Sequence, residues 1–372
     1  MKKEKDKMKI LHICPDFPYT KLYNLLITQL EADQQNTVYV TTPEKNIKTD
    51  YPTYYLGRDF GVVDRVLFFR KQTIIQKDIE RKHLCDEADM IHAHNLFSAG
   101  FTARILSKKN KIPYIVAVRN TDVNVFFKYM IHLRSLGVKI MRDAAAVIFI
   151  SPAYKEHVLS TYVPDQLLKD ISEKSYVIPN GIDEFFLKKQ PDSPKELLDS
   201  KRIRLIYVGE ININKNLTTT IKACELLKKR GYNTSFTVVG PILESQCESI
   251  KHNHMVTYIP KSPKEIVLEL LRESDIFVMP SFKETFGLVY IEALSQGLPI
   301  VYSRGQGVDG YFDEGDVGYH VEATNPKEIA DCVENIIADY SSISKRCIEA
   351  SRLFSWKEIS TKYSKIYNII KE

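Results

Sequence analysis

One stretch in the last third of the chain decides the fold. It reads SDIFVMPSFKETFGLVYIEALSQGLPIV over residues 274–301. The apolar run at 276–279 has the composition of a buried parallel strand, and it ends at the turn residues Pro280 and Ser281. From about Thr285 the pattern predicts a helix. A strand that leads through a turn into a helix is a unit of a parallel α/β sheet.

The same stretch carries candidate ligand-binding groups. The first N–H groups of a helix lack intrahelical partners, and together with the helix dipole they form a site for phosphate. Gly287 allows the backbone to approach a ligand closely. Glu284 and Glu292 are eight residues apart, a little over two helical turns, so both lie on roughly one face. We expect these two carboxylates to hold hydroxyl groups of one long ligand.

Short β-branched runs alternate with helical patterns along the whole chain, which predicts parallel sheets with crossover helices. The first series has strands expected at 10–13, 37–41, 90–93, 114–118, 146–150 and 176–178, with helices near 21–32, 64–84, 97–109, 123–142 and 152–160. The second has strands expected at 204–209, 235–240, 256–259, 276–279, 300–302 and 318–321, with helices near 216–230, 263–272, 285–296, 326–338 and 341–353.

The length of 372 residues predicts two or three domains. Pro179, Asn180 and Gly181 end a strand and mark the boundary. We therefore expect an N-terminal domain over 1–183, a second domain over 184–355 and a final helix over 356–372. That helix has one apolar face to bury, and we expect it to pack back on the first domain. The face is formed by Trp356, Ile359, Tyr363, Ile366, Ile369 and Ile370.

Composition excludes several classes of protein. Apolar residues make up 44% and charged residues 27%, as in globular proteins. No apolar run reaches the ~20 residues that cross a bilayer, and the charged N-terminus is unlike a signal peptide. The cysteines have no short paired spacing, so neither a disulfide framework nor a zinc site is indicated. These observations predict a cytoplasmic protein.

Positive charge is concentrated in the first half of the chain. Residues 1–183 hold 27 Lys and Arg against 21 Asp and Glu, whereas residues 184–372 hold 25 against 26. Within 104–142 only Asp122 opposes nine cations, which suggests an anionic partner for that surface. These nine are Arg104, Lys108, Lys109, Lys111, Arg119, Lys128, Arg134, Lys139 and Arg142.

The spacing of Glu284 and Glu292 resembles the E-x7-E signature of retaining glycosyltransferases of family 4. Other matches to the family pattern are the Pro-Ser turn, the Gly-Leu-Pro at 297–299, the Val-Gly at 208–209 with Lys215, and the segments 177–183 and 91–94. The resemblance covers about residues 90–300. It implies the GT-B architecture, which consists of two Rossmann-like doubly wound α/β domains that face each other across a cleft.

The resemblance also implies roles for individual residues. Glu284 would contact the hydroxyls of the donor sugar, Lys215 would neutralise the diphosphate and Glu292 would bind the ribose. The implied donor site comprises Gly209, Lys215, Glu284, Phe286, Gly287, Leu288, Val289 and Glu292. No cofactor and no metal ion are expected, and the absence of an Asp-x-Asp triplet agrees with this.

Three positions differ from the family pattern. Glu210 stands where the family often has arginine, 16–21 replaces a Gly-Gly loop, and Arg119 stands where a histidine is frequent. Arg119 is either a strand-end arginine that pairs with Asp122 or a catalytic cation aimed at the leaving phosphate or at an acidic sugar.

On the acceptor side we expect His92, His94 and Asp122. The two histidines are one residue apart at a strand end, so both point to the same side of a regular strand. No nearby Cys or carboxylate completes a metal site, which favours structural or acceptor-contacting roles.

The segment 126–142 is rich in aromatic residues and cations. It is either a core-facing helix with a solvated basic face or a surface that contacts anionic lipid, where each basic residue contributes about 1 kcal/mol. A role in nucleic-acid binding is disfavoured, because no basic face is interleaved with base-stacking aromatics.

The family resemblance, together with these observations, implies a metal-independent, retaining glycosyltransferase of the hexosyltransferase type. Its donor is expected to be a nucleotide sugar, UDP- or GDP-linked, and its acceptor a saccharide or lipid-linked glycan in surface polysaccharide synthesis. We expect a cytoplasmic location with peripheral contact at the inner face of the membrane. Two alternatives remain open: a nucleotide-sugar isomerase of the same fold, and an inactive nucleotide-sugar-binding subunit.

Overall fold

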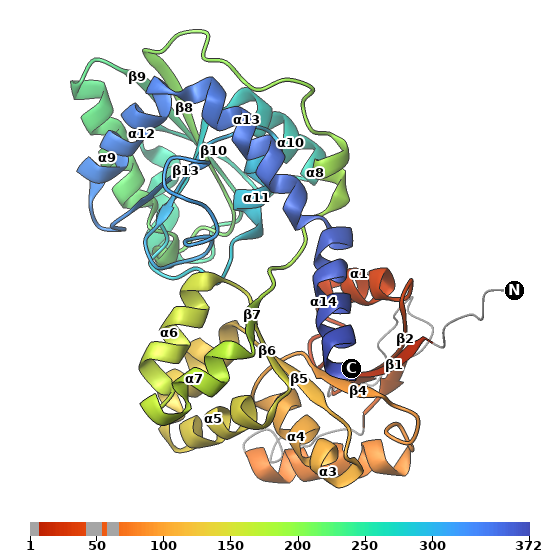
Figure 1. The fold of residues 1–372 in the computed structure, drawn as a ribbon. Coiled ribbons are helices and arrows are strands. Elements are labelled where there is room, and N and C mark those ends of the chain that lie inside the picture. Colours follow the sequence, from red (N-terminus) through yellow and green to blue (C-terminus); the bar gives the residue numbers. More distant parts are fainter. Residues whose placement is uncertain (1–6, 42–53, 58–66) are drawn as a thin grey trace, which may run out of the picture. The chain divides into compact units, whose positions relative to one another are not determined.

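The computed structural model describes residues 7–41, 54–57 and 67–372 (Figure 1). Its contacts divide the chain into two compact units. Unit 1 comprises residues 1–150, 155–180 and 356–372, and unit 2 comprises 151–154 and 181–355. Among the described residues, no helix has both the length and the apolar character that a bilayer crossing requires. The start of the helix expected at 64–84 lies partly outside the described residues.

Unit 1 is built on a seven-stranded sheet with the order β3-β2-β1-β4-β5-β6-β7, in which all pairs of neighbouring strands are parallel. Its strands are β1 (Met8–Ile13), β2 (Gln34–Val40), β3 (Tyr54–Leu56), β4 (Met90–Ala93), β5 (Tyr114–Val118), β6 (Ala146–Phe149) and β7 (Ser175–Val177). Its helices include α1 (Lys21–Leu30), α3 (Phe68–Arg81), α4 (Ser98–Asn110), α5 (Arg134–Asp143), α7 (Asp165–Glu173) and α14 (Trp356–Lys371). Helix α6 (Pro152–Tyr162) spans the boundary between the units.

Unit 2 is built on a six-stranded parallel sheet with the order β10-β9-β8-β11-β12-β13. Its strands are β8 (Arg202–Val208), β9 (Asn233–Val239), β10 (Val256–Ile259), β11 (Ile276–Met279), β12 (Ile300–Ser303) and β13 (Gly318–Val321). Its helices include α8 (Glu184–Lys188), α9 (Leu217–Lys229), α10 (Lys264–Glu273), α11 (Leu288–Ser295), α12 (Pro326–Ala338) and α13 (Tyr340–Ser351).

Two doubly wound parallel sheets confirm the predicted fold class. The sequence prediction missed β3, α7 and α8. Strand β3 has three residues, too few for a periodic pattern to show. Helix α11 begins at Leu288 rather than at Thr285, because the left-handed conformation of Gly287 separates the turn from the helix.

The prediction of one helix over 123–142 is wrong. The structure has a π-helix η1 (Asp122–Phe127), a 3-10 turn η2 (Ile131–Leu133) and then α5. The break frees carbonyl groups, and the Arg134 guanidinium donates to the carbonyls of Phe127 and Lys128 at 2.6 and 3.2 Å. Arg134 therefore stabilises the break instead of continuing a basic helical face.

The last helix, α14, completes the core of unit 1. Its buried side chains pack in one apolar cluster with residues of β1, β4, β5 and β6. The members from α14 are Trp356, Ile359, Tyr363, Ile366 and Tyr367. This packing on the first domain is as the amphipathic pattern predicted.

Polar contacts fix the position of α14 on the sheet. The Tyr367 hydroxyl lies 2.8 Å from Nδ1 of His92, and the amide of Gln34 donates to the Ser364 hydroxyl at 3.1 Å. Each contact joins the C-terminal helix to a strand about 300 residues earlier in the chain. Because such buried polar contacts are satisfied in one position of the helix only, they specify its register.

We expect Ile359→Ala to lower the free energy of unfolding of unit 1 by about 2–5 kcal/mol, the usual range for Ile→Ala changes in a core. The reason is that Ile359 is fully buried. The measurement is urea unfolding followed by the fluorescence of Trp356, the chain's single tryptophan, which is buried in the same cluster. The matched control is Ile369→Ala on the same helix, where the side chain is 61% exposed. If both variants lower the free energy of unfolding by the same amount, the assignment of Ile359 to the core is contradicted.

Candidate functional site

The candidate site in unit 2 lies where the strand order of its sheet reverses. Strands β8 and β11 are neighbours, and the loops that follow them, 209–216 and 280–287, emerge at the same carboxyl edge. Open parallel sheets bind ligands outside the carboxyl ends of the strands at such a point. Lys215 comes from the first loop and Glu284 from the second.

Asparagine side chains fix the loop after β8. The side chain of Asn212 accepts from the backbone N–H of Lys215 at 3.2 Å, and Asn216 is left-handed, with φ at 55°. The Asn216 amide donates to the carbonyls of Pro280 and Ala323. The loop that carries Lys215 is therefore held directly against the loop that carries Glu284.

Lys215 and Glu284 form the central pair of the site. The Nζ of Lys215 lies 2.6 Å from Oε2 of Glu284, and the two side chains are 18% and 14% exposed. The other carboxylate oxygen, Oε1, accepts from the backbone N–H of Thr285 at 3.0 Å. Because both oxygens are bound, the carboxylate has a fixed orientation, and the ammonium group is held beside it.

A third loop, after β12, supports the backbone of Glu284. The side-chain Oε1 of Gln306 accepts from the N–H of Glu284 at 3.0 Å, and the N–H of Gly307 donates to the carbonyl of Glu284 at 2.8 Å. A Cβ at Gly307 would lie 3.0 Å from the Phe286 carbonyl and 3.1 Å from Cγ of Glu284. The sequence analysis missed both residues, and the Gly-Gln-Gly spacing at 305–307 was the available signal.

Helix α11 presents its N-terminus at this loop. Gly287 precedes the helix with φ at 78°, and a Cβ there would come within 2.6 Å of the Tyr290 ring, so glycine is required at this position. The N–H groups of Leu288 and Val289 belong to the first turn, where no helical carbonyl is available. The predicted phosphate-binding groups are thus within three to five residues of Glu284 along the chain.

Phe286, also predicted at the donor site, has its side chain inside unit 2. It is 2% exposed and packs against the rings of Tyr311 and Phe354, each with centroids 5.7 Å away. Gly209 directly follows β8, and a Cβ on Gly240 would lie 1.8 Å from the carbonyl oxygen of Gly209. Phe286 and Gly209 therefore shape the loops, and their backbone atoms alone are available to a ligand.

Glu292 lies one to two turns into α11, beside the ion pair that Lys264 and Asp183 form at 2.6 Å. Burial, followed by the nearby carboxylate of Asp183, raises the pKa of Glu292 to about 7, and Lys264 opposes this shift. A carboxyl group with a pKa raised by burial is costly to keep ionised, and such groups are frequent at functional sites.

In unit 1 the predicted acceptor-side histidines are buried. His92, His94 and His12 from β1 are at most 1% exposed, and the rings of His92 and His94 stack at 3.9 Å. Nδ1 of His12 lies 2.9 Å from Nε2 of His94, and Nε2 of His12 lies 2.9 Å from the Asn36 amide oxygen. Burial lowers the pKa of all three histidines, that of His12 to about 4. They form a neutral polar core.

One nitrogen from each of the three histidines lies within 4.8 Å of the others, a spacing that a metal ion could use. Two of these rings are hydrogen-bonded to each other, and the positive charge of Arg119 lowers the pKa of His92 and His94 further. A nearby fixed cation disfavours a divalent ion. That the chain binds no metal ion stays a prediction.

Asp122, the third acceptor-side residue, is 1% exposed. Its carboxylate accepts from the backbone N–H groups of Leu96, Phe97 and Arg119 at 2.9, 3.1 and 2.9 Å. Burial raises its pKa to about 6 against these hydrogen bonds. Asp122 therefore joins the loops after β4 and β5, and it binds the backbone of Arg119 rather than the guanidinium.

Arg119 follows β5 at the carboxyl edge of the first sheet and is partly exposed. Its Nη1 lies 3.5 Å from the side-chain oxygen of Asn180, and its side chain also hydrogen-bonds to the Tyr363 hydroxyl. Its Nε is buried and has no hydrogen-bond partner among the residues that the structure describes. The site residues therefore form two groups, one in each unit.

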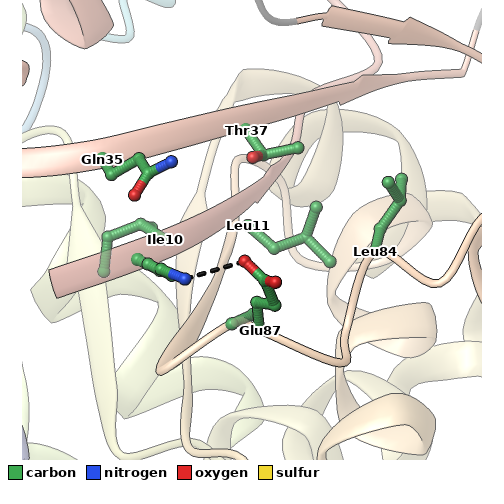
Figure 2. Close-up of a pocket in the computed structure, with 8 residues that line it drawn as sticks. Ile10, Leu11, Gln35, Thr37, Leu84 and Glu87 are labelled. Atoms are coloured by element: carbon green, nitrogen blue, oxygen red, sulfur yellow. Dashed lines mark hydrogen bonds and ion pairs between the residues drawn. The ribbon is translucent and has the colours of Figure 1, made fainter.

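A cavity at the opposite, amino edge of the first sheet is not a candidate site. Figure 2 shows it between β1, β2 and the segment 84–88, with the Lys9–Glu87 ion pair across it at 2.7 Å. Its volume is about 60 Å³. Pockets for nucleotide-sized ligands usually have 300 Å³ or more.

Sequence models of two families match this chain. The family described as "Glycosyl transferases group 1" matches residues 188–354, and "Glycosyltransferase Family 4" matches residues 23–184. A similar curated protein is an uncharacterized glycosyltransferase of Methanocaldococcus jannaschii, 23% identical over 308 residues, which are 77% of this chain and 77% of that protein.

Solved structures show the same fold. The lipopolysaccharide outer core galactosyltransferase WaaB in its apo form aligns with a TM-score of 0.74 and 13% identity over 97% of this chain and 99% of its own. Anabaena HepE in complex with UDP and glucose aligns with a TM-score of 0.65 and 16% identity over 97% of this chain and 100% of its own. The architecture of this chain is GT-B, as expected.

We expect Glu292→Gln to stabilise the protein at pH 8 by up to about 3 kcal/mol and to have little effect at pH 4.5. The unfolded chain ionises Glu292 near 4.5 and the folded chain near 7, so the folded state binds more protons in this window and loses stability as the pH rises through it. The measurement is calorimetric unfolding at both pH values, with the exposed Glu225→Gln on α9 as control. Equal effects at the two pH values would refute the raised pKa.

Proposed function

Because this chain belongs to the group 1 and family 4 glycosyltransferases, we propose that it transfers a sugar from a nucleotide-sugar donor to an acceptor hydroxyl with retention of anomeric configuration. The observation that carries this proposal is the Lys215–Glu284 pair at 2.6 Å, in which Glu284 stands three residues before Gly287 at the N-terminus of α11. An ammonium group, an oriented carboxylate and free backbone N–H groups are the groups that a sugar diphosphate requires.

Each group has a distinct task in the proposed reaction. Lys215 and the N–H groups of Leu288 and Val289 bind the diphosphate and stabilise the negative charge that develops as the bond from the sugar to the phosphate breaks. Glu284 accepts hydrogen bonds from hydroxyls of the donor sugar. Glu292 accepts from the ribose hydroxyls.

Retention follows if the acceptor hydroxyl attacks from the face that the diphosphate leaves. The bond from the acceptor oxygen to the anomeric carbon forms, the bond to the phosphate oxygen breaks, and that phosphate oxygen takes the acceptor's proton. The protein then needs no nucleophile of its own, and its contribution is positioning and charge stabilisation. Since Lys215 and backbone groups bind the diphosphate, the proposal includes no metal ion.

Among possible donors, UDP- and GDP-sugars are the first to test, and HepE, a structure of the same fold, is in complex with UDP. The acceptor class proposed is a surface polysaccharide or a lipid-linked glycan. WaaB, also of this fold, is a lipopolysaccharide outer core galactosyltransferase.

We expect Lys215→Ala and Glu284→Ala each to lower the rate of nucleotide release from the donor sugar by on the order of 10²–10³-fold, because each removes a group that stabilises the transition state. The donor is first identified by thermal shift with a panel of nucleotide sugars, and rates are then measured in excess EDTA.

The matched controls are Lys222→Ala and Glu225→Ala, which remove the same residue types from the exposed face of α9. Control-like turnover in either site variant would exclude the assigned site. Activity that requires added Mg²⁺ or Mn²⁺ would exclude the metal-independent mechanism.

We further propose that the protein, in the cytoplasm, contacts anionic membranes peripherally. The surface that we propose for this contact is not the basic stretch 104–142 as a whole. Four of those nine cations are in ion pairs: Arg104, Lys108 and Arg142 pair with Asp143 at 2.7–2.9 Å, and Lys109 pairs with Glu80 at 3.0 Å. Two carboxylates thus engage four of the nine cations, and these four are not available to a lipid surface in the way the sequence suggested.

A more suitable surface is an apolar tip formed by two segments of unit 1. The rings of Phe68 and Phe126 bring the segments together, with centroids 6.1 Å apart. Around them five large apolar side chains are 40–67% exposed, namely Leu67, Phe69, Val125, Tyr129 and Ile131. Arg70 and Lys128 are exposed beside them. Exposed apolar side chains rimmed by cations fit a surface of anionic lipid.

We expect the purified protein to sediment with vesicles that contain anionic lipid at 0.05–0.1 M salt and to dissociate at about 1 M, where the Debye length falls to about 3 Å. The double variant Tyr129→Ser, Ile131→Ser should bind several-fold more weakly. Leu198→Ser is the control, because Leu198 is 99% exposed in unit 2. If the double variant binds vesicles as well as the wild type does, the apolar tip is not the surface that contacts the membrane. If the wild type does not bind at low salt, membrane contact is excluded.

A further inference from the structure

Arg119 is held by neutral groups. Its guanidinium carbon lies 5.9 Å from the centroid of the Tyr23 ring, and its hydrogen-bond partners are the Asn180 amide oxygen and the Tyr363 hydroxyl. Among the residues that the structure describes, no carboxylate oxygen lies within 4.0 Å of the guanidinium. A partly buried cation without a carboxylate partner is energetically costly.

The carboxylates nearest to Arg119 have other partners. Asp122 accepts from three backbone N–H groups, one of them that of Arg119 itself. Asp16, in the loop after β1, is hydrogen-bonded by Asn95 and interacts electrostatically with Lys71 as well as with Arg119. The positive charge of the guanidinium is therefore compensated only at a distance.

The position of Arg119 in the sheet is that of a ligand-binding residue. β1 and β4 are neighbours at the point where the strand order of the first sheet reverses, and β5 is next to β4. Asp16, Asn95 and Arg119 follow these three strands, so all three lie at one carboxyl edge. This is the edge at which open parallel sheets bind their ligands.

We propose that Arg119 binds an anionic group, a phosphate or a carboxylate, on the acceptor saccharide. This proposal rests on the proposed function, since it names the acceptor of that reaction. The planar guanidinium binds both groups through two parallel hydrogen bonds, and an anion there supplies the charge partner that the protein does not. A neutral sugar hydroxyl supplies a hydrogen bond but no charge.

The test measures binding of three probes to the full chain by isothermal titration calorimetry with UDP present: glucose 6-phosphate, glucuronate and glucose. We expect at least one anionic sugar to bind at least tenfold more tightly than glucose. Arg119→Gln should lower that affinity at least tenfold, and Arg119→Lys less, because lysine keeps the charge and loses the paired geometry. The anionic probe that binds more tightly identifies the group as a phosphate or a carboxylate.

The control is Lys111→Gln, which removes an exposed cation near the amino end of the same strand, β5. It should bind the probes as the wild type does. UDP affinity, measured on each variant, shows whether unit 2 is folded and should stay unchanged.

Three results would overturn the proposal: equal affinity of the wild type for all three sugars, unchanged affinity of Arg119→Gln for the anionic ones, or a loss of UDP affinity in Arg119→Gln with the fold intact by circular dichroism. The last result would assign Arg119 to the donor diphosphate. Failure of the wild type to bind any nucleotide would instead refute the proposed function, so the two failures are distinguishable.

Discussion

All neighbouring strands in both sheets are parallel, and this constraint determines where chemistry can occur. Every loop that follows a strand emerges at the same edge, so residues far apart in sequence meet there. Lys215 and Glu284 are 69 positions apart, yet their side chains lie 2.6 Å from each other because β8 and β11 are neighbours. The same geometry in unit 1 brings the loops after β1, β4 and β5 together.

The charged groups of the candidate site in unit 2 lower the stability of the fold, which does not need them. A partly buried ion pair contributes little net stability, because the desolvation of both charges offsets their attraction. Glu292 adds a carboxyl group that burial makes hard to ionise. Gln306 and Gly307 fix the backbone of Glu284 on both sides, which keeps the carboxylate oriented before any ligand binds. Stability given up for a prearranged charge is typical of a binding site.

The sequence predicted strands such as β5 and β11 well, because their burial on both faces leaves a continuous apolar run. Strands β4, β5, β10, β11 and β13 were predicted to the residue. It failed at 123–142, because periodicity cannot show that the Arg134 side chain replaces the helical hydrogen bonds of the Phe127 and Lys128 carbonyls. Among site residues, charge and spacing indicated Lys215 and Glu284. Gln306 carries no charge, and beyond the two glycines that flank it the sequence gives no indication of its role, which depends on a contact between loops.

Burial affects the charge of the three histidines and the charge of Arg119 differently, although all four residues belong to the same sheet region of unit 1. Desolvation keeps His12, His92 and His94 neutral at physiological pH, so they link β1, β4 and α14 without adding charge. Arginine stays protonated under the same conditions because its reference pKa lies far above the neutral range. The positive charge at this edge is therefore constant across the neutral range. A histidine at position 119 would lose its charge in such surroundings, whereas arginine retains the fixed charge that recognition of an anionic group requires.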